Sequence, residues 1–232
     1  MKRLTFRKFI ALVLSALLLL LTGCQRTVPQ TADAVTVIQL KASSRGVRKF
    51  KKQMGDAFPN YHGRFATVKD CYNIVPREIS EQYGFNMFTL PYYARSYLQY
   101  EDKIYSIGEW GGSVTSLAVT DRNADGQWEL FFTYVWGSGR TIFRVGYFDS
   151  ATKEMTIFED FPVFVDFEEI PYIVLNTDAE GALCVYRAEA ADENQSVLDF
   201  DFRIGEKIAT VTYDGGAMTL SQENNAILNT NF

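Results

Sequence analysis

The sequence predicts a mainly β protein, an antiparallel meander with minor helix near its N-terminus. Three observations lead to this class. Aromatic residues make up 15% of the 232 residues, which suits half-buried strands better than helical bundles. From Tyr100 onward, β-branched and aromatic residues recur at a period of two. Within each of the two sets of segments, 103–158 and 172–220, the connections are shorter than the dozen residues that a parallel crossover needs, so neighbouring strands are expected to be antiparallel.

Turn residues divide this region into ten expected strands. They cover residues 103–107, 114–120, 128–136, 140–148, 153–158, 172–175, 183–187, 197–203, 208–213 and 218–220. A turn at Gly205-Glu206 is expected to separate the segments 197–203 and 208–213. The spacing predicts blade-like four-stranded units, packed as a sandwich or arranged as a small irregular propeller. With 47% hydrophobic residues, the chain can bury a core, which excludes a disordered or collagen-like protein.

Two short helices are expected before these strands. Val47, Phe50 and Met54 are spaced as on one face of an amphipathic helix. The segment 77–83 lies between a proline and a glycine, the residues that favour the beginning and the end of a helix.

A basic patch surrounds the first expected helix. Its members are Lys41, Arg45, Arg48, Lys49, Lys51 and Lys52. Such a patch fits a contact with anionic lipid headgroups, and it equally fits a solvated helix face. The sequence leaves both interpretations open.

The N-terminus has the organisation of an export signal. The basic residues Lys2, Arg3, Arg7 and Lys8 precede an apolar run over residues 9–21. That run has the length of a signal-peptide core and is shorter than the roughly 20 residues that cross a bilayer. We therefore expect a cleaved signal peptide rather than a permanent membrane span.

The tetrapeptide Leu21-Thr22-Gly23-Cys24 resembles the lipobox of bacterial lipoprotein signal peptides. The resemblance implies that Cys24 receives a diacylglyceryl group, that the chain is cut before it, and that the new N-terminus is acylated, with palmitate-type chains. It implies a lipid-anchored protein on the extracytoplasmic face of the cell membrane. We accordingly expect a signal peptide over 1–23, a lipidated tether and basic segment over 24–55, and a β-rich domain over 56–232.

The charge of the expected mature chain bears on its partners. Residues 24–232 contain 19 basic and 28 acidic residues. So acidic a body repels phosphate backbones, and no nucleic-acid partner is expected. The membrane is the expected partner through the lipid anchor, together with a glycan or protein ligand at the cell surface.

Two cysteines remain after Cys24. Export would permit a disulfide between Cys71 and Cys184. Free cysteines are also among the residues most often buried as small hydrophobes. The sequence gives no distance between the two, so the bridge and two free thiols both stay open.

One motif carries metal chemistry. The segment Asp121-Arg122-Asn123-Ala124-Asp125-Gly126-Gln127-Trp128-Glu129 places side-chain oxygens at positions 1, 3, 5 and 9, with glycine at position 6. A hard cation such as Ca²⁺ takes six to eight oxygen ligands. Position 12 is Phe132, so the bidentate carboxylate of an EF-hand is missing.

Because strands flank it, this loop resembles the calcium loops of FG-GAP and VCBS-type β-propeller repeats. That resemblance implies a calcium site formed by the side chains of Asp121, Asn123, Asp125 and Glu129 and by the carbonyl of Gln127. The alternative is an Asx-turn hairpin, in which the same side chains cap backbone amides. Without a cation, however, the acids of such a loop would repel one another, which favours calcium.

No catalytic constellation stands out. His62 is the only histidine, so zinc or triad chemistry would rest on it alone. We therefore expect a non-enzymatic binding or interaction module with a calcium loop. The alternative is an envelope or cell-wall glycan hydrolase, for which acids and aromatics are present but no signature is.

Overall fold

The computed structural model describes residues 34–57, 69–108, 112–136, 141–159, 161, 163–165, 172–192, 198 and 200–222. By its internal contacts the chain divides into the units Met1–Thr31 and Ala32–Phe232, and every described residue belongs to the second. No helix in these ranges is both long and apolar enough to cross a bilayer. The expected signal peptide, the lipobox with Cys24, and His62 lie outside the described residues.

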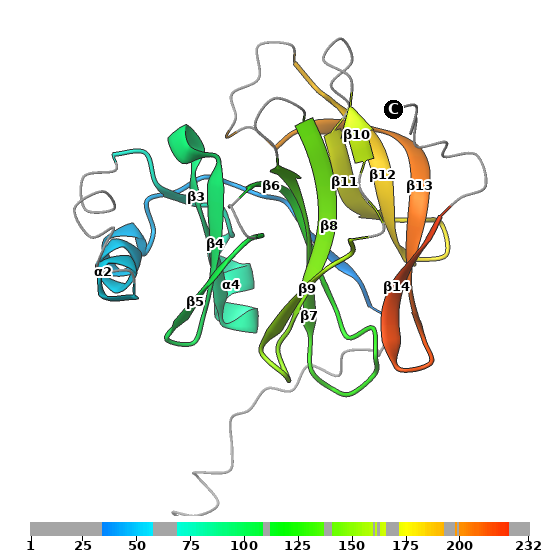
Figure 1. Ribbon diagram of the computed structural model, residues 1–232, viewed down its shortest axis with the longest axis horizontal. Coiled ribbons are helices and arrows are strands. Elements are labelled where there is room, and N and C mark those ends of the chain that lie inside the picture. The colour runs from blue at the N-terminus through cyan, green and yellow to red at the C-terminus, as the bar shows by residue number, and fades with distance from the viewer. Residues whose placement is uncertain are drawn as a thin grey trace, which may run out of the picture. The chain divides into compact units, whose positions relative to one another are not determined.

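The described chain is mainly β, as predicted, and its strands form three antiparallel sheets (Figure 1). The first sheet is a meander of β2 (Tyr72–Asn73), β3 (Phe85–Leu90), β4 (Arg95–Tyr100) and β5 (Lys103–Ser106). The central sheet has the order β1 (Thr36–Ile38), β6 (Ser113–Thr120), β7 (Glu129–Trp136), β8 (Thr141–Asp149) and β10 (Val163–Val165), with β9 (Glu154–Ile157) also paired to β8. The third sheet is a meander of β11 (Tyr172–Thr177), β12 (Leu183–Ala190), β13 (Phe202–Asp214) and β14 (Ala217–Gln222). The third sheet is thus one of the predicted four-stranded units, whereas β2 to β4 of the first sheet precede the region in which strands were expected.

The central sheet is buried on both faces, because alternate side chains of its strands enter two different cores. Toward the first sheet it presents Leu117, Val119, Leu130 and Phe132. Toward the third sheet it presents Ala118, Phe131, Phe143 and Val145. A sheet covered on both faces needs apolar residues at nearly every position, which explains why β7 is apolar except for Glu129 at its start and Thr133.

Both expected helices are present. Helix α2 (Val47–Ala57) covers the face of the first sheet that points away from the central sheet (Figure 1). Its Phe50 ring stacks on Phe88 of β3, with centroids 4.1 Å apart. Helix α4 (Arg77–Tyr83) ends at Gly84, whose φ of 76° is left-handed. A short 3₁₀ turn, η2 (Pro91–Tyr93), connects β3 to β4.

One turn that was expected from the sequence is absent from the structure. Strand β13 runs without interruption from Phe202 to Asp214, so Gly205-Glu206 is not a turn. Gly205 lies against the carbonyl oxygen of Arg187, which a Cβ would meet at 3.2 Å. The glycine therefore permits a close approach of β13 to β12, where the register between the two strands shifts.

A bulge in β6 joins the central sheet to the third sheet. The register between β6 and β7 shifts at Thr115, and the hydroxyls of Thr115 and Ser116 both reach β11. Thr115 donates to the carbonyl of Ile173 at 3.1 Å, and Ser116 accepts from the amide of Leu175 at 2.8 Å. These hydroxyls form hydrogen bonds with a carbonyl and an amide on the edge strand β11. Without them, these backbone groups would be free to pair with a strand of another chain.

Candidate metal centre

The predicted calcium loop connects β6 to β7. Its ends are fixed by the β-pair Thr120–Glu129. At its C-terminal end the Trp128 ring packs against Phe85 and Tyr100 of the first sheet, with centroids 5.4 and 5.2 Å away. The Trp128 amide donates to the Ser150 hydroxyl, and the Ser150 amide donates to the Trp128 carbonyl, both at 3.1 Å. The loop is therefore held by both the core and the β8–β9 turn.

Two residues of the loop have left-handed backbone, Ala124 with φ 57° and Gly126 with φ 82°. This path turns successive backbone amides toward the acidic side chains. Asp121 accepts from the amides of Asp125 at 3.1 Å and Gly126 at 3.0 Å. Glu129 Oε2 accepts from the amide of Arg122 at 2.7 Å. Hydrogen bonds across the loop thus bring its first and last acids together.

The structure brings three of the predicted ligand side chains into one cluster. Asp121, Asp125 and Glu129 each offer a carboxylate oxygen within 4.8 Å of the others. No basic side chain of the described residues forms an ion pair with any of the three. A fourth acid, Asp149 on β8, is the register partner of Glu129. The cluster therefore concentrates negative charge that no cation of the described chain neutralises.

Glu129 is the most constrained of these acids. Its side chain is fully buried, and its Oε1 atom has no hydrogen-bond partner. Burial raises the pKa of the Glu129 carboxyl to about 7, and the charges of Asp149, Asp121 and Asp125 act in the same direction. A buried acceptor without a partner costs about 1–3 kcal/mol. A divalent cation at Oε1 would remove that cost and the repulsion together.

The other two predicted ligands lie in the same loop. Asn123 Oδ1 accepts from the amide of Asp125 at 3.0 Å, and the amide of Gln127 donates to Asp125 Oδ1 at 2.7 Å. These are the hydrogen bonds of the Asx-turn alternative, and they leave further lone pairs on the same oxygens. An Asx-turn loop alone does not explain why Oε1 of Glu129 is buried and unpartnered. The carbonyl of Gln127 stays a predicted ligand.

A second loop provides an internal comparison. Asp178, between β11 and β12, accepts from the amides of Glu180 at 3.1 Å and Ala182 at 2.9 Å. Chiefly through the Ala182 hydrogen bond, the pKa of Asp178 is lowered from its ordinary value. Lys207 also lies 3.7 Å from its carboxylate. The carboxylate of Asp178 thus has hydrogen-bond donors and a nearby cation from the protein itself, whereas Oε1 of Glu129 has neither from the described residues.

The structure keeps the two remaining cysteines apart as free, buried thiols. Cys71 packs in the core beneath α2, and burial raises its pKa to about 11. Cys184 lies on β12, where it contacts Asp178 and Thr210. The disulfide that the sequence left open is not formed.

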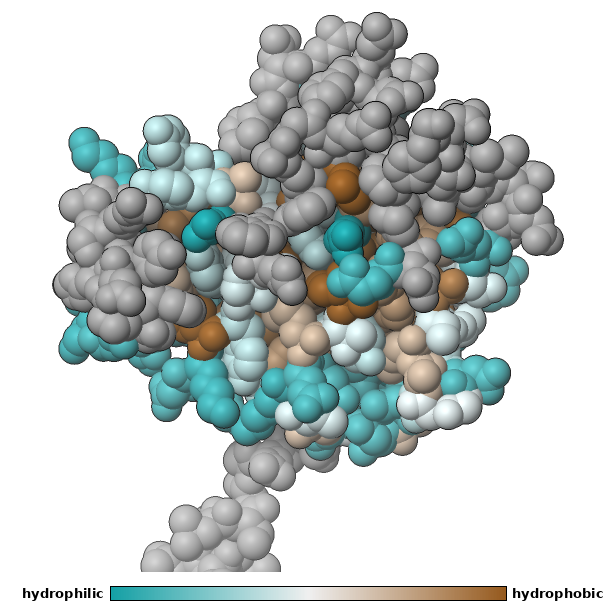
Figure 2. Space-filling view, viewed as in Figure 1, coloured by the Kyte–Doolittle hydropathy of each residue, from teal (hydrophilic) through white to brown (hydrophobic). Residues whose placement is uncertain are grey.

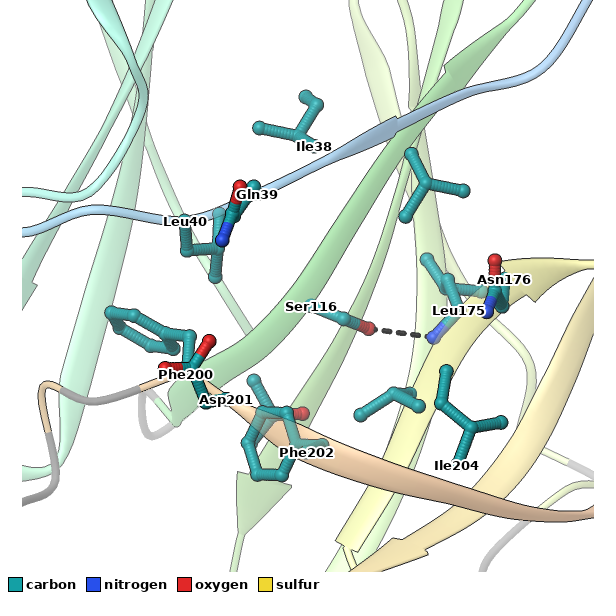
Figure 3. Close-up of a pocket in the computed structure, with 13 residues that line it drawn as sticks. Ile38, Gln39, Leu40, Ser116, Leu175, Asn176, Phe200, Asp201, Phe202 and Ile204 are labelled. Carbon is teal, nitrogen blue, oxygen red and sulfur yellow. Dashed lines mark hydrogen bonds between the residues drawn. The ribbon is translucent and has the colours of Figure 1, made fainter. Parts of the chain in front are cut away.

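Sequence reasoning did not find a groove of about 250 Å³ between the central and third sheets (Figure 3). Ile38 and Leu40 form one wall, Phe200 and Phe202 form the opposite one, and Ser116 lies between them. The lining combines apolar side chains with polar ones such as Gln39, Ser116 and Asn176, and Asp201 is the one carboxylate among its described residues. The residues come from distant parts of the chain and share no spacing, so no sequence signal marks them.

Comparisons of the chain with protein-family models, with curated proteins and with solved structures find no match.

Proposed function

We propose that this protein is a non-enzymatic binding module, lipid-anchored at the extracytoplasmic face of a bacterial cell membrane and stabilised by Ca²⁺ in the β6–β7 loop. The observation that carries the calcium site is the unpartnered, buried Oε1 of Glu129, within 4.8 Å of carboxylate oxygens of Asp121 and Asp125. Carboxylate, amide and carbonyl oxygens in a tight loop are the ligands that Ca²⁺ takes. A metal that prefers nitrogen or sulfur has no partner in this loop.

Terbium luminescence tests the site directly, because Tb³⁺ occupies oxygen-rich calcium sites. Trp128 is the sequence neighbour of Glu129, so its indole is close enough to sensitise a bound Tb³⁺ ion. We expect sensitised emission that millimolar Ca²⁺ displaces. Glu129→Gln should abolish the emission, whereas Asp178→Asn should retain it. Emission that is unchanged in Glu129→Gln would contradict this site.

The anchor proposal is supported by the order of basic segment, apolar run and lipobox at the N-terminus. Two or three acyl chains, at about 0.8 kcal/mol per buried CH₂, hold a protein on a membrane effectively without release. Labelled palmitate fed to expressing cells should appear in the wild-type protein and not in Cys24→Ala. A wild-type protein without lipid would contradict the proposal.

The groove between the central and third sheets supports a binding role. It combines apolar walls, which ligand pockets need, with polar groups that could orient a ligand, although most pockets for drug-sized ligands are larger. A glycan hydrolase needs a pair of carboxylates across its substrate, and among the described residues that line the groove Asp201 is the only carboxylate. We therefore expect a screen of cell-wall glycans and surface peptides to find binding without turnover. Turnover that one carboxylate substitution abolishes would instead establish the hydrolase.

A further inference from the structure

Helix α2 presents a basic face to solvent while its apolar face is buried. Phe50 and Met54 are at most 1% exposed in the core beneath the helix. Arg48, Lys49 and Lys52 are exposed, and no side chain of the described residues pairs with them. The helix is therefore firmly seated on the first sheet and turns its unpaired cations outward.

These charges are poorly placed for the stability of the helix. Arg48 and Lys49 lie in its first turn, which contains no acid, although the positive end of the helix dipole favours acids there. Arg48 and Lys52 are four residues apart, a spacing at which like charges repel. The arrangement is explained better by an external anionic partner than by the fold.

The rest of the chain has the opposite charge. Residues 41–69 contain eight basic residues and one acidic residue, whereas residues 70–232 contain ten basic and 26 acidic residues. An anionic surface would therefore attract α2 and repel most of the remaining body. This asymmetry would orient the protein on such a surface.

We propose that the outer face of α2, formed by Arg48, Lys49 and Lys52, docks on the anionic headgroups of the membrane that holds the protein. The inference rests on the proposed lipid anchor, because only 11 residues lie between Cys24 and the start of β1 at Thr36. A fully extended segment of this length spans about 40 Å. The anchor thus keeps the helix near the headgroups at a high effective concentration.

The strength of the contact follows from the number of charges. Each Lys or Arg near an anionic bilayer strengthens binding by about fivefold, so three cations give about 100-fold. That is weak for a free protein and sufficient for a tethered one. Because the Debye length is about 8 Å at physiological ionic strength, the contact should be lost at high salt.

Lysine footprinting of the full, lipidated chain tests the docking. The protein is reconstituted into vesicles of neutral phosphatidylcholine, with or without anionic phosphatidylglycerol, and treated with a membrane-impermeant acylating reagent. Lys49 and Lys52 should react several-fold more slowly on the anionic vesicles, and 0.5 M salt should restore their reactivity. Lys103, an exposed lysine on β5, is the control lysine outside α2. It should react equally on both kinds of vesicle.

A charge-reversal pair controls for net charge. Arg48→Glu keeps both reporter lysines and should remove most of their protection, whereas Arg203→Glu on β13, with the same change in charge, should not. Equal reactivity of Lys49 and Lys52 on the two vesicles would overturn the proposal. A soluble polyphosphate, added to protein on neutral vesicles, could instead protect Lys49 and Lys52 when anionic vesicles do not. That result would overturn membrane docking in favour of a soluble anionic polymer as the ligand. If the protein dissociates from neutral vesicles, the proposed lipid anchor is wrong. Protection of Lys49 and Lys52 on anionic vesicles would still test the docking of α2 in that case.

Discussion

Glu129 concentrates the chemistry of the candidate site in one side chain. The sequence predicted Glu129 as the ligand at position nine of the loop, because the spacing of acids within a short loop is a local property. Its burial was not predicted. Asp149 is the register partner of Glu129, and Ser150 bonds to the neighbouring Trp128; both are 20 or more residues away in sequence and come near only when β8 pairs with β7.

The raised pKa of Glu129 predicts an unusual pH dependence in calcium-free buffer. The unfolded carboxyl ionises near its ordinary value of 4.5, whereas the folded one holds its proton up to about 7. The unfolded state therefore binds fewer protons between these values, and stability falls as pH rises across this window. From the size of the shift the loss is at most about 3 kcal/mol.

Urea unfolding of the wild type and of Glu129→Gln at pH 5 and pH 8 measures this pH-dependent loss of unfolding free energy. The amide cannot ionise and its oxygen can still accept from Arg122, so the variant should lack this fall and be the more stable protein at pH 8 without calcium. Taking the difference between the two proteins removes the titration of the groups that do not interact with Glu129. A variant that is less stable than the wild type at pH 8 would show that Glu129 is not a destabilising buried charge.

Gly126 gives a second prediction at the scale of single residues. Its φ of 82° is left-handed, and a Cβ would meet nothing within 4 Å. Gly126→Ala should therefore cost about 1–2 kcal/mol of unfolding free energy from backbone strain alone. Gly126→Asn should cost less, because asparagine tolerates this conformation. Equal denaturation midpoints for the two variants would rule out strain as the cause.

At the scale of elements, the bulge of β6 determines how the central and third sheets meet. Thr115 is the extra residue of the bulge, and it lets two successive hydroxyls reach the edge of β11. A regular strand would direct one of them to the opposite face. The bulge thus provides a polar connection inside a largely apolar interface.

Removing one of these hydroxyls should be costly. Ser116→Ala leaves the buried amide of Leu175 without its acceptor, and we expect a loss of about 1–3 kcal/mol in unfolding free energy. Ser106→Ala is the matched control, because Ser106 is exposed and, among the described residues, its hydroxyl donates only to the carbonyl of Gly108; it should change stability by less than about 0.5 kcal/mol. Similar effects of the two substitutions in denaturant titrations would show that the β11 edge does not depend on Ser116.

The elements also show what local pattern can predict. Strands β6 to β9, β11 and β12 were located by their period of two, and α4 by the proline and glycine at its ends. Strands β1 and β2 have three and two residues, too few to show a period. Gly205 was taken for a turn because its close approach to Arg187 exists only after β12 and β13 pair.

For the whole molecule, the sequence predicted the antiparallel meander but not the order in which its sheets pack. That order depends on which face of each strand is covered, and in the central sheet both faces are. The turns that connect β6 to β7 and β8 to β9 lie at the lower edge of the molecule in Figure 1, where Figure 2 shows hydrophilic residues gathered.

The predicted calcium loop joins two of these layers. It is part of the central sheet, and Trp128 within it packs on Tyr83, Phe85 and Tyr100 of the first layer. An ion that fixes the loop should therefore stabilise the packing of the two layers as well as the loop itself. We expect calcium to shift the global unfolding transition.

The most direct test of the account is thermal unfolding of the full chain in excess Ca²⁺ and in chelator. At 100 times the Kd, linkage adds about 2.7 kcal/mol. For a protein of this size that should raise the melting temperature by about 5–10 °C. Extracellular sites bind in the range of about 10⁻⁴–10⁻³ M, so at least 10 mM calcium is needed. Asp125→Ala should abolish the shift and Asp178→Ala should keep it, whereas identical wild-type melting curves in calcium and chelator would show that the loop is an Asx-turn hairpin without an ion.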